Sequence, residues 1–192
     1  SQFRWSLLVC RDAVTGEVRW SKTGYGAPGG RPLVRGGKVI CVSGERIAEL
    51  DLGTGEVIRS AEPVKNGDFN SPGDLVETAD LYLKGTKNSG LVAIDKKTLK
   101  RAWTGTCGDS LVGVAPYRCR GTKCIPTTPT VLPDGKTVCA GGADGAIHFW
   151  SLKDGKLLRS IKTGAPYLGP VVASGSVVYA ADLAGFVRAF SV

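Results

Sequence analysis

The segment Ile47-Ala-Glu-Leu-Asp-Leu-Gly-Thr-Gly-Glu-Val-Ile-Arg59 contains two short apolar stretches separated by a Thr-Gly turn. Ala48 and Leu50 alternate with polar residues, as the side chains of a half-buried strand do. Gly55 supplies the positive φ that a tight hairpin turn requires. The residues after the turn return as a second strand, so the segment predicts an antiparallel hairpin.

This hairpin is repeated along the chain. Three further segments, residues 8–20, 91–103 and 147–159, align with it, and residues 187–192 form a truncated copy. The anchor position of the repeat is held by Asp12, Asp51, Asp95, Ser151 and Ser191, which are 39, 44, 56 and 40 residues apart. A period near 40 residues with several strands in each unit is typical of propeller blades.

Between successive hairpins the sequence predicts two further strands. A Gly/Pro-containing crossover is followed by an apolar strand that begins at Pro32, Pro72, Pro129 or Pro170, where no ladder N–H is needed. A Gly-containing turn then leads to another apolar strand. We therefore predict an all-β protein, a β-propeller of four-stranded antiparallel blades, in units of approximately 1–25, 26–64, 65–105, 106–163 and 164–192.

The pattern Ala-x-Asp-x-x-Thr-Gly-x-x-x-Trp, with the Pro-led strand that follows it, resembles the PQQ-like (quinoprotein) β-propeller repeat. In that family the Trp packs between neighbouring blades, and Trp20 and Trp103 match its position. Arg59 and Arg159 replace the Trp in two blades, and Leu99 replaces the turn glycine in one. The resemblance implies that these departures weaken the docking of neighbouring blades.

Two looser resemblances concern later parts of the chain. Residues 134–156 also resemble a WD40 blade, although no Gly-His dipeptide precedes them. The last half, from residue 115 to residue 190, is loosely similar to the propeller tails of secreted calcineurin-type metallophosphoesterases. None of the metal-binding motifs of the phosphoesterase is present, so this resemblance implies an accessory part of a larger secreted protein.

The blade count predicts an incomplete ring. Complete propellers of the PQQ-like family usually have seven or eight blades, whereas this chain predicts about four, with half a blade at its start and a blade without its last strand at its end. Either the two ends pair, or further blades from the same or another chain complete the ring. We favour a larger propeller, because an open fragment would expose two blade edges, which natural sheets avoid.

Charge and composition limit the classes of partner. The 25 Lys and Arg against 17 Asp and Glu give a net charge of +8, yet the basic residues form no long cluster and no aromatic platform. Nucleic acid is therefore disfavoured as a partner, although an anion-binding module for polyanionic glycan or nucleic acid remains an alternative. No apolar run approaches the ~18 residues that a membrane span needs.

Catalytic signals are weak. The resemblance implies that an enzyme of this family would need a bound ion, a catalytic Asp and commonly a pair of adjacent cysteines. No Cys-Cys pair occurs in this sequence. Most aspartates fall at repeat anchors and turn tips, where a structural role is expected. The single histidine, His148, is expected to be a hydrogen-bonded strand residue, and no Ser/His/Asp set can be assembled around it by motif. We predict no enzyme activity, no metal and no cofactor; a fragment of a PQQ-dependent oxidoreductase is the alternative.

Five of the six cysteines form two groups, and Cys10, in a predicted strand, is expected to resemble the first of them. Cys41 and Cys139 occur in similar strand sequences, so we expect them to share a repeat position and a sheet face as small buried hydrophobes. Cys107, Cys119 and Cys124 lie in or beside an insertion between residues 105 and 127. A disulfide between Cys119 and Cys124 would suit an extracellular protein, and free thiols or a metal site with the histidine are the alternatives.

Binding is the remaining class of function. The starts of the inner strands surround the central opening of a propeller, and an insertion in a regular repeat marks a contact surface. We therefore predict a protein- or glycan-interaction module in the extracellular space or periplasm. Its binding surface is formed by Arg31, Asn70, Thr128 and Leu168 at strand starts, and by Tyr117, Arg118, Arg120 and Lys123 in the insertion.

Overall fold

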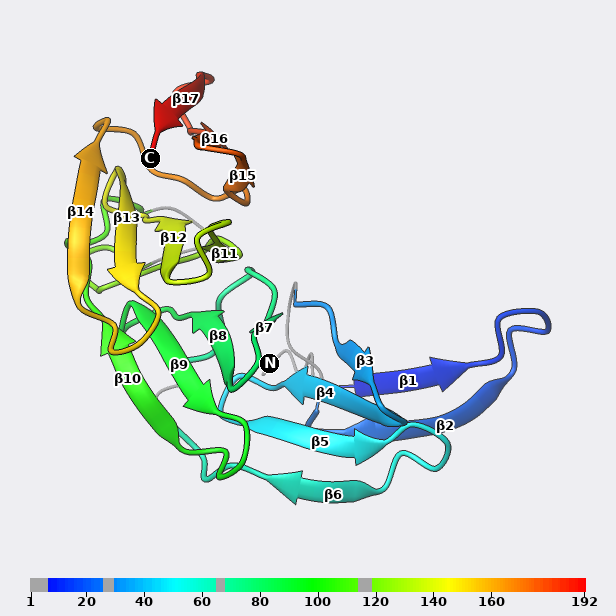
Figure 1. Ribbon diagram of the computed structural model, residues 1–192. Helices are drawn as coiled ribbons and strands as arrows, with labels where there is room; N and C mark the ends of the chain where they lie inside the picture. The colour runs from blue at the N-terminus through cyan, green and yellow to red at the C-terminus, as the bar shows by residue number, and fades with distance from the viewer. Residues whose placement is uncertain (1–6, 26–29, 65–67, 114–118) are drawn as a thin grey trace.

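The computed structural model describes residues 7–25, 30–64, 68–113 and 119–192 of the chain. In these residues the chain forms seventeen strands and no helix. The strands build five antiparallel sheets, and the sheets follow one another along an arc (Figure 1). The predicted all-β propeller of about four blades is confirmed.

Three blades are complete four-stranded sheets whose strands lie side by side in chain order. The second blade consists of β3 (Leu33–Arg35), β4 (Lys38–Val42), β5 (Ile47–Asp51) and β6 (Val57–Ser60). The third consists of β7 (Val76–Glu77), β8 (Leu81–Gly85), β9 (Leu91–Asp95) and β10 (Arg101–Gly105). The fourth consists of β11 (Thr130–Val131), β12 (Thr137–Gly141), β13 (Ala146–Ser151) and β14 (Leu157–Lys162).

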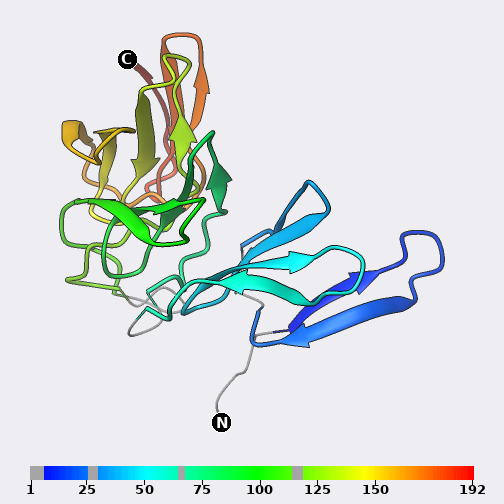
Figure 2. The ribbon, with the colours of Figure 1, turned by 60° about the horizontal axis from the view of Figure 1, so that its bottom comes forward.

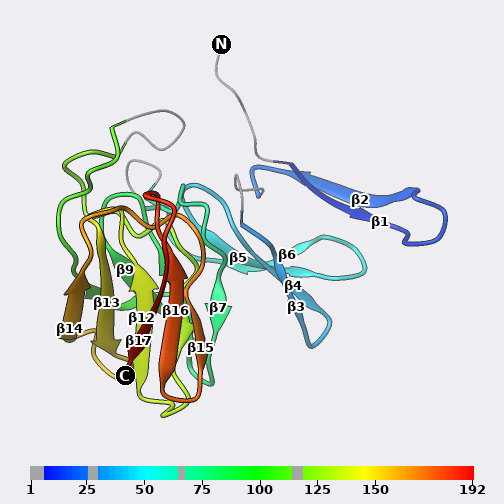
Figure 3. The same ribbon diagram turned by 90° about the horizontal axis from the view of Figure 1, so that it is seen from above.

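The blades at the two ends of the arc are partial. The first contains β1 (Leu7–Arg11) and β2 (Val18–Thr23), which correspond to the third and fourth strands of a complete blade. The last contains β15 (Val172–Ser174), β16 (Val177–Ala181) and β17 (Val187–Ser191), and it lacks a fourth strand in the described residues. Figures 2 and 3 show the first blade projecting from one end of the arc, away from the last. The predicted half blade at the start and three-stranded blade at the end are confirmed.

The hydrophobic core is divided into layers between neighbouring blades. The layer between the third and fourth blades contains Leu83 and Leu91 from one side and Val138 and Trp150 from the other, all fully buried. Further layers join the second blade to the third, the fourth to the fifth, and the first to the second. Each complete blade packs one face on the preceding blade and the other on the next, so its second and third strands are buried on both faces.

In two of the blades, a tryptophan of the outer strand contacts the next blade. Trp103 donates a hydrogen bond from Nε1 to the backbone carbonyl of Leu152, at 3.1 Å. Its ring covers the turn glycine Gly155, where a Cβ atom would lie 2.5 Å from the ring. Trp20 makes the equivalent contacts between the first and second blades, with its hydrogen bond at 2.9 Å.

Arginine keeps the inter-blade hydrogen bond where it replaces tryptophan. Arg59 donates to the carbonyls of Lys96 and Lys97, both at 2.6 Å, and Arg159 donates to the carbonyl of Ser191 at 3.2 Å. A hydrogen bond between neighbouring blades is therefore kept at both positions, because a guanidinium also donates to carbonyl oxygens. The predicted weakening of the docking stays a prediction. In the turn that Arg59 reaches, the position of the glycine is held by Leu99, the one non-Gly residue with positive φ in the described residues.

The expected equivalence of Cys41 and Cys139 is wrong by one residue. Lys38 pairs with the anchor Asp51, and Cys41 lies three residues after Lys38. Thr137 pairs with the anchor Ser151, and Cys139 lies only two residues after Thr137. A shift of one residue moves a side chain to the other face of a sheet. Both cysteines are buried as expected, but Cys41 faces the first blade and Cys139 faces the last.

Candidate functional site

Two of the predicted rim residues meet at Asp74. The guanidinium of Arg31 donates to the Asp74 carboxylate at 2.7 and 2.9 Å, and the Asp74 backbone N–H donates to Thr128 Oγ1 at 2.8 Å. Burial alone would raise the pKa of Asp74, but the hydrogen bonds from Arg31 hold that pKa below its ordinary value. The Arg31 side chain is 86% exposed, so a charged pair is presented at the surface.

The other two predicted rim residues lie outside this cluster. Asn70 is exposed, and its amide group lies against Gly44, where a Cβ atom would clash with it. Leu168 is half-buried. Within the described residues, no hydrogen bond joins either of them to Arg31 or Asp74. The predicted rim is therefore not one continuous polar site.

The insertion is tied to the third blade at Lys123. Its backbone forms a parallel bridge with Ser89, and its Nζ makes a 2.7 Å ion pair with Asp109. The hydrogen bond that Lys123 donates to this carboxylate raises the pKa of Lys123. Arg120 is exposed. Tyr117 and Arg118, which were also predicted to bind, lie outside the described residues.

A buried lysine, Lys84, holds the backbone next to Asp74, and the sequence analysis did not identify it. Lys84 is 2% exposed, and its Nζ donates to the carbonyls of Ser71 and Gly73. Burial lowers its pKa to about 8. Cys41 and Ala140 hold the same repeat position in the neighbouring blades. A lysine where other blades have a small apolar residue was therefore the sequence signal that could have identified Lys84 as a buried charge.

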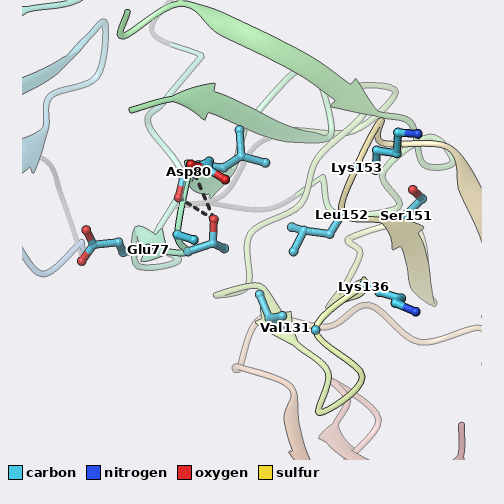
Figure 4. A pocket seen from close by; sticks show the side chains of 11 residues that line it. Glu77, Asp80, Val131, Lys136, Ser151, Leu152 and Lys153 are labelled. Atoms are coloured by element: carbon cyan, nitrogen blue, oxygen red, sulfur yellow. Dashed lines mark hydrogen bonds between the residues drawn. The ribbon is translucent and has the colours of Figure 1, made fainter. Parts of the chain in front are cut away.

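A groove of about 910 Å³ lies between the third and fourth blades (Figure 4). One wall is the segment from Glu77 to Leu81, which connects β7 to β8. The other wall is formed by Lys136 and by Ser151 and the two residues after it. Because these are turns at the ends of the first and third strands, the groove opens on the opposite side of the blades from the predicted rim and insertion.

The floor of the groove is apolar. Leu81, Val131 and Leu152 are half-buried, and all three pack against the core layer between the two blades. Leu152 is held in place from behind, because its carbonyl accepts the Trp103 hydrogen bond. The contact that docks the blades therefore also shapes the floor of the groove.

The two walls differ in charge. On the third blade, Glu77 is neutralised by ion pairs with Lys96 at 2.6 Å and Arg35 at 3.3 Å, and Asp80 is exposed. On the fourth blade, Lys136 and Lys153 are exposed, and neither makes an ion pair with a described residue. The fourth-blade wall thus offers two exposed positive charges beside an apolar floor.

The single histidine joins two polar partners across the fourth blade. His148 Nε2 lies 2.9 Å from Asp144 Oδ2, and His148 Nδ1 lies 2.9 Å from Ser160 Oγ. The expected hydrogen-bonded strand residue is confirmed. The sequence offers no motif for a Ser/His/Asp set, and the three residues meet only because cross-strand pairing brings Ser160 to His148. Asp144 also accepts the Gly108 N–H at 2.7 Å, so the chain of groups fastens the insertion to this blade.

None of the six cysteines is paired in the structure, so a disulfide between Cys119 and Cys124 is not shown and stays a prediction. Both of these residues are buried in one small cluster together with Val112 and Ala143. Cys107 belongs to the core layer between the third and fourth blades instead. No three His, Cys, Asp or Glu side chains gather as a metal-binding group in the part of the chain that the structure describes.

Comparison with known proteins places the chain among propellers. A family model described as "Outer membrane protein assembly factor BamB" matches residues 6–111. The angio-associated migratory cell protein of Homo sapiens is 38% identical over 52 residues, which are 27% of this chain and 12% of that protein. The chain therefore corresponds to a small part of this curated relative.

Two solved structures resemble the whole of the described arc. BamB from Moraxella catarrhalis aligns with a TM-score of 0.74 at 22% identity, over 98% of this chain and 56% of that chain. Quinohemoprotein alcohol dehydrogenase from Comamonas testosteroni aligns with a TM-score of 0.73 at 15% identity, over 98% of this chain and 39% of that chain. These likenesses show the propeller fold, and this chain spans about half of the first structure and less of the second.

Proposed function

The chain belongs to the PQQ-like propeller family whose model is described as "Outer membrane protein assembly factor BamB", and on this premise we propose that it is a non-catalytic protein-interaction module. The family description names an assembly factor, which supports a role in contacting other proteins. The observation that carries the proposal is the groove between the third and fourth blades, with its apolar floor and basic wall.

The chemistry of the groove favours an extended protein segment over a glycan. Leu81, Val131 and Leu152 offer apolar surface, which gains ~25 cal/mol for each Å² removed from water by an apolar side chain of the partner. Lys136 and Lys153 would pair with carboxylates of the same segment and fix its direction. The groove volume of about 910 Å³ lies in the range of ligand sites, roughly 300–1,000 Å³. The partner is therefore a segment that combines apolar and acidic side chains.

We also propose an extracellular or periplasmic location, as an accessory part of a larger protein. The family description, which names the outer membrane, supports this location. No helix of the described residues is long and apolar enough to cross a membrane. The two partial blades at the ends of the arc are consistent with further blades from the same or another chain.

A polyanion site is the second candidate, because the same two lysines belong to a chain with a net charge of +8. Binding of a polyanion depends steeply on salt, since it releases counterions, whereas binding at an apolar floor depends on salt only weakly. Titration with heparin at two salt concentrations separates the two candidates.

A peptide selection tests the proposed function. A random peptide library is selected against the whole chain and again against a variant carrying both Lys136→Glu and Lys153→Glu. We expect the wild-type chain to enrich peptides with acidic and apolar residues, and the variant to lose them. Lys162→Glu, an exposed lysine of the same blade outside the groove, is the matched control and should keep them. Enrichment of the same peptides by wild type and double variant would contradict the proposal.

A further inference from the structure

Cys119 and Cys124 enclose a short loop that its own backbone already closes. The two side chains are 3% and 4% exposed and share one cluster with Val112 and Ala143. Between them, the Thr122 backbone N–H donates to the Cys119 carbonyl at 3.0 Å, which completes a tight turn. The two cysteines therefore flank a tight turn and share one buried cluster.

The surrounding structure holds this loop from several sides. Gly121 has a φ of +75°, and its N–H donates to the Ser110 carbonyl at 3.0 Å. Thr122 Oγ1 donates to the Lys87 carbonyl at 2.7 Å, which ties the loop to the third blade. Ser110 Oγ lies 3.1 Å from Cys119 Sγ. The loop conformation is therefore fixed by contacts that do not depend on a covalent link.

The other four cysteines lie in different surroundings. Cys41, Cys107 and Cys139 belong to three separate core layers, and Cys10 is half-buried in a strand of the first blade.

Burial raises the pKa of the Cys124 thiol, and the Cys119 thiol beside it raises that pKa further. Among the six cysteines, Cys119 and Cys124 are the two that share one cluster.

We propose that Cys119 and Cys124 are joined by a disulfide when the protein folds in an oxidising compartment. The oxidant is a disulfide of the glutathione type, and the reaction is thiol–disulfide exchange. The thiolate of one cysteine attacks the oxidant disulfide, forming a mixed disulfide and releasing one thiolate, which takes up a proton. The second cysteine then gives up its proton and attacks the protein sulfur of the mixed disulfide. One S–S bond forms, two cysteine thiols are oxidised, and the oxidant is reduced to two thiols.

The timing of this reaction follows from burial. A thiol must be deprotonated to attack, and burial raises the pKa of Cys124 and opposes deprotonation. Exchange therefore takes place while the loop is still open during folding, and it is slow once the cluster has packed. The product is a covalent clasp across the loop that carries Arg120 and Lys123, on the side of the molecule opposite the groove.

Peptide mapping after refolding tests the disulfide. The reduced, unfolded chain is refolded with oxidised and reduced glutathione, denatured, alkylated without reduction and digested with trypsin. Because trypsin cuts after Arg118, Arg120 and Lys123, the disulfide would join the dipeptide of residues 119–120 to the peptide that starts at Cys124. We expect to find this joined pair of peptides together with four alkylated cysteines. The joined pair should disappear when the digest is reduced.

Two variants complete the test. Cys107→Ser should leave the joined pair intact, because Cys107 packs in another layer, and Cys124→Ser should abolish it and leave five alkylated cysteines. Six alkylated cysteines after refolding of the wild-type chain would overturn the proposal. A disulfide between Cys107 and either loop cysteine would overturn it as well.

Discussion

The indole ring of Trp103 lies on Gly155 of the next blade, where a Cβ atom would come within 2.5 Å of the ring. Gly155 also has a φ of +71°, which an L side chain rarely adopts. The same pairing recurs between Trp20 and Gly55. The turn glycine therefore serves two purposes, because it allows the hairpin to turn and leaves room for the ring that docks the preceding blade.

Gly155→Ala should destabilise the protein by about 2–4 kcal/mol, from the strained φ together with the overlap with the Trp103 ring. Gly135→Ala is the matched control: φ there is +63°, but nothing lies within 4 Å of the added Cβ. It should cost only about 1–2 kcal/mol. Urea unfolding of both variants measures the difference, and equal losses would show that the ring contact contributes nothing.

Trp103→Arg should retain more stability than Trp103→Ala. Arg59 already shows that a guanidinium at this repeat position reaches the turn carbonyls of the next blade. Alanine removes both the hydrogen bond to Leu152 and the ring from a nearly buried site, and we expect a loss of about 3–5 kcal/mol. Thermal unfolding of the two variants compares them, and an arginine variant as unstable as the alanine variant would argue against the equivalence.

These contacts show which features the sequence predicts. The hairpins were predictable because the turn that joins two strands lies within one segment, as in the stretch around Gly55. The role of Arg59 was not, because its partners lie 37 and 38 residues away on another blade. Pairing register decided the face of Cys139, and a similarity of short strand sequences does not determine register.

The candidate site was predicted in part. Arg31 and Thr128 were both predicted at strand starts, and in the structure each of them bonds to Asp74, a residue that carried no motif. The groove was not predicted because its walls are ordinary turns, and their side chains face each other only after two blades have docked. Ser160 was missed as a partner of His148 for the same reason, since cross-strand pairing brings them together.

Glu49 should make the stability of the protein fall as the pH drops into the acidic range. It is 2% exposed and is paired with Lys38 and Arg59. Burial opposes its ionisation, but the hydrogen bonds from these two cations keep its pKa below the ordinary value of 4.5. Since the folded-state pKa is depressed, the stabilisation is fully present above the unfolded-state pKa and is lost as pH falls through the folded-state pKa.

The measurement is urea unfolding of wild type and Glu49→Gln between pH 7 and pH 3. We expect the wild-type protein to be the more stable at pH 7, with the difference shrinking below pH 4.5. A difference that stays constant over this range would contradict the ion-pair role of Glu49.

Lys84 should make stability rise with pH in the alkaline range. Its folded-state pKa is lowered from 10.5 to about 8 by burial, so the unfolded chain binds more protons between these two values. Stability contributed by this group therefore rises as pH increases from 8 to 10.5, by about 3 kcal/mol at most. Lys84→Met should lack this rise, and parallel pH profiles of the two proteins would contradict the shift.

The most direct measurement is the affinity of a peptide selected for apolar and acidic residues, determined by fluorescence anisotropy with the wild-type chain and with the Lys136→Glu, Lys153→Glu double variant. We expect the double variant to bind at least about tenfold more weakly, which corresponds to ~1.4 kcal/mol. The Lys162→Glu control should bind like wild type, since it lies outside the groove. An equal Kd for wild type and double variant would contradict the groove as the interaction site.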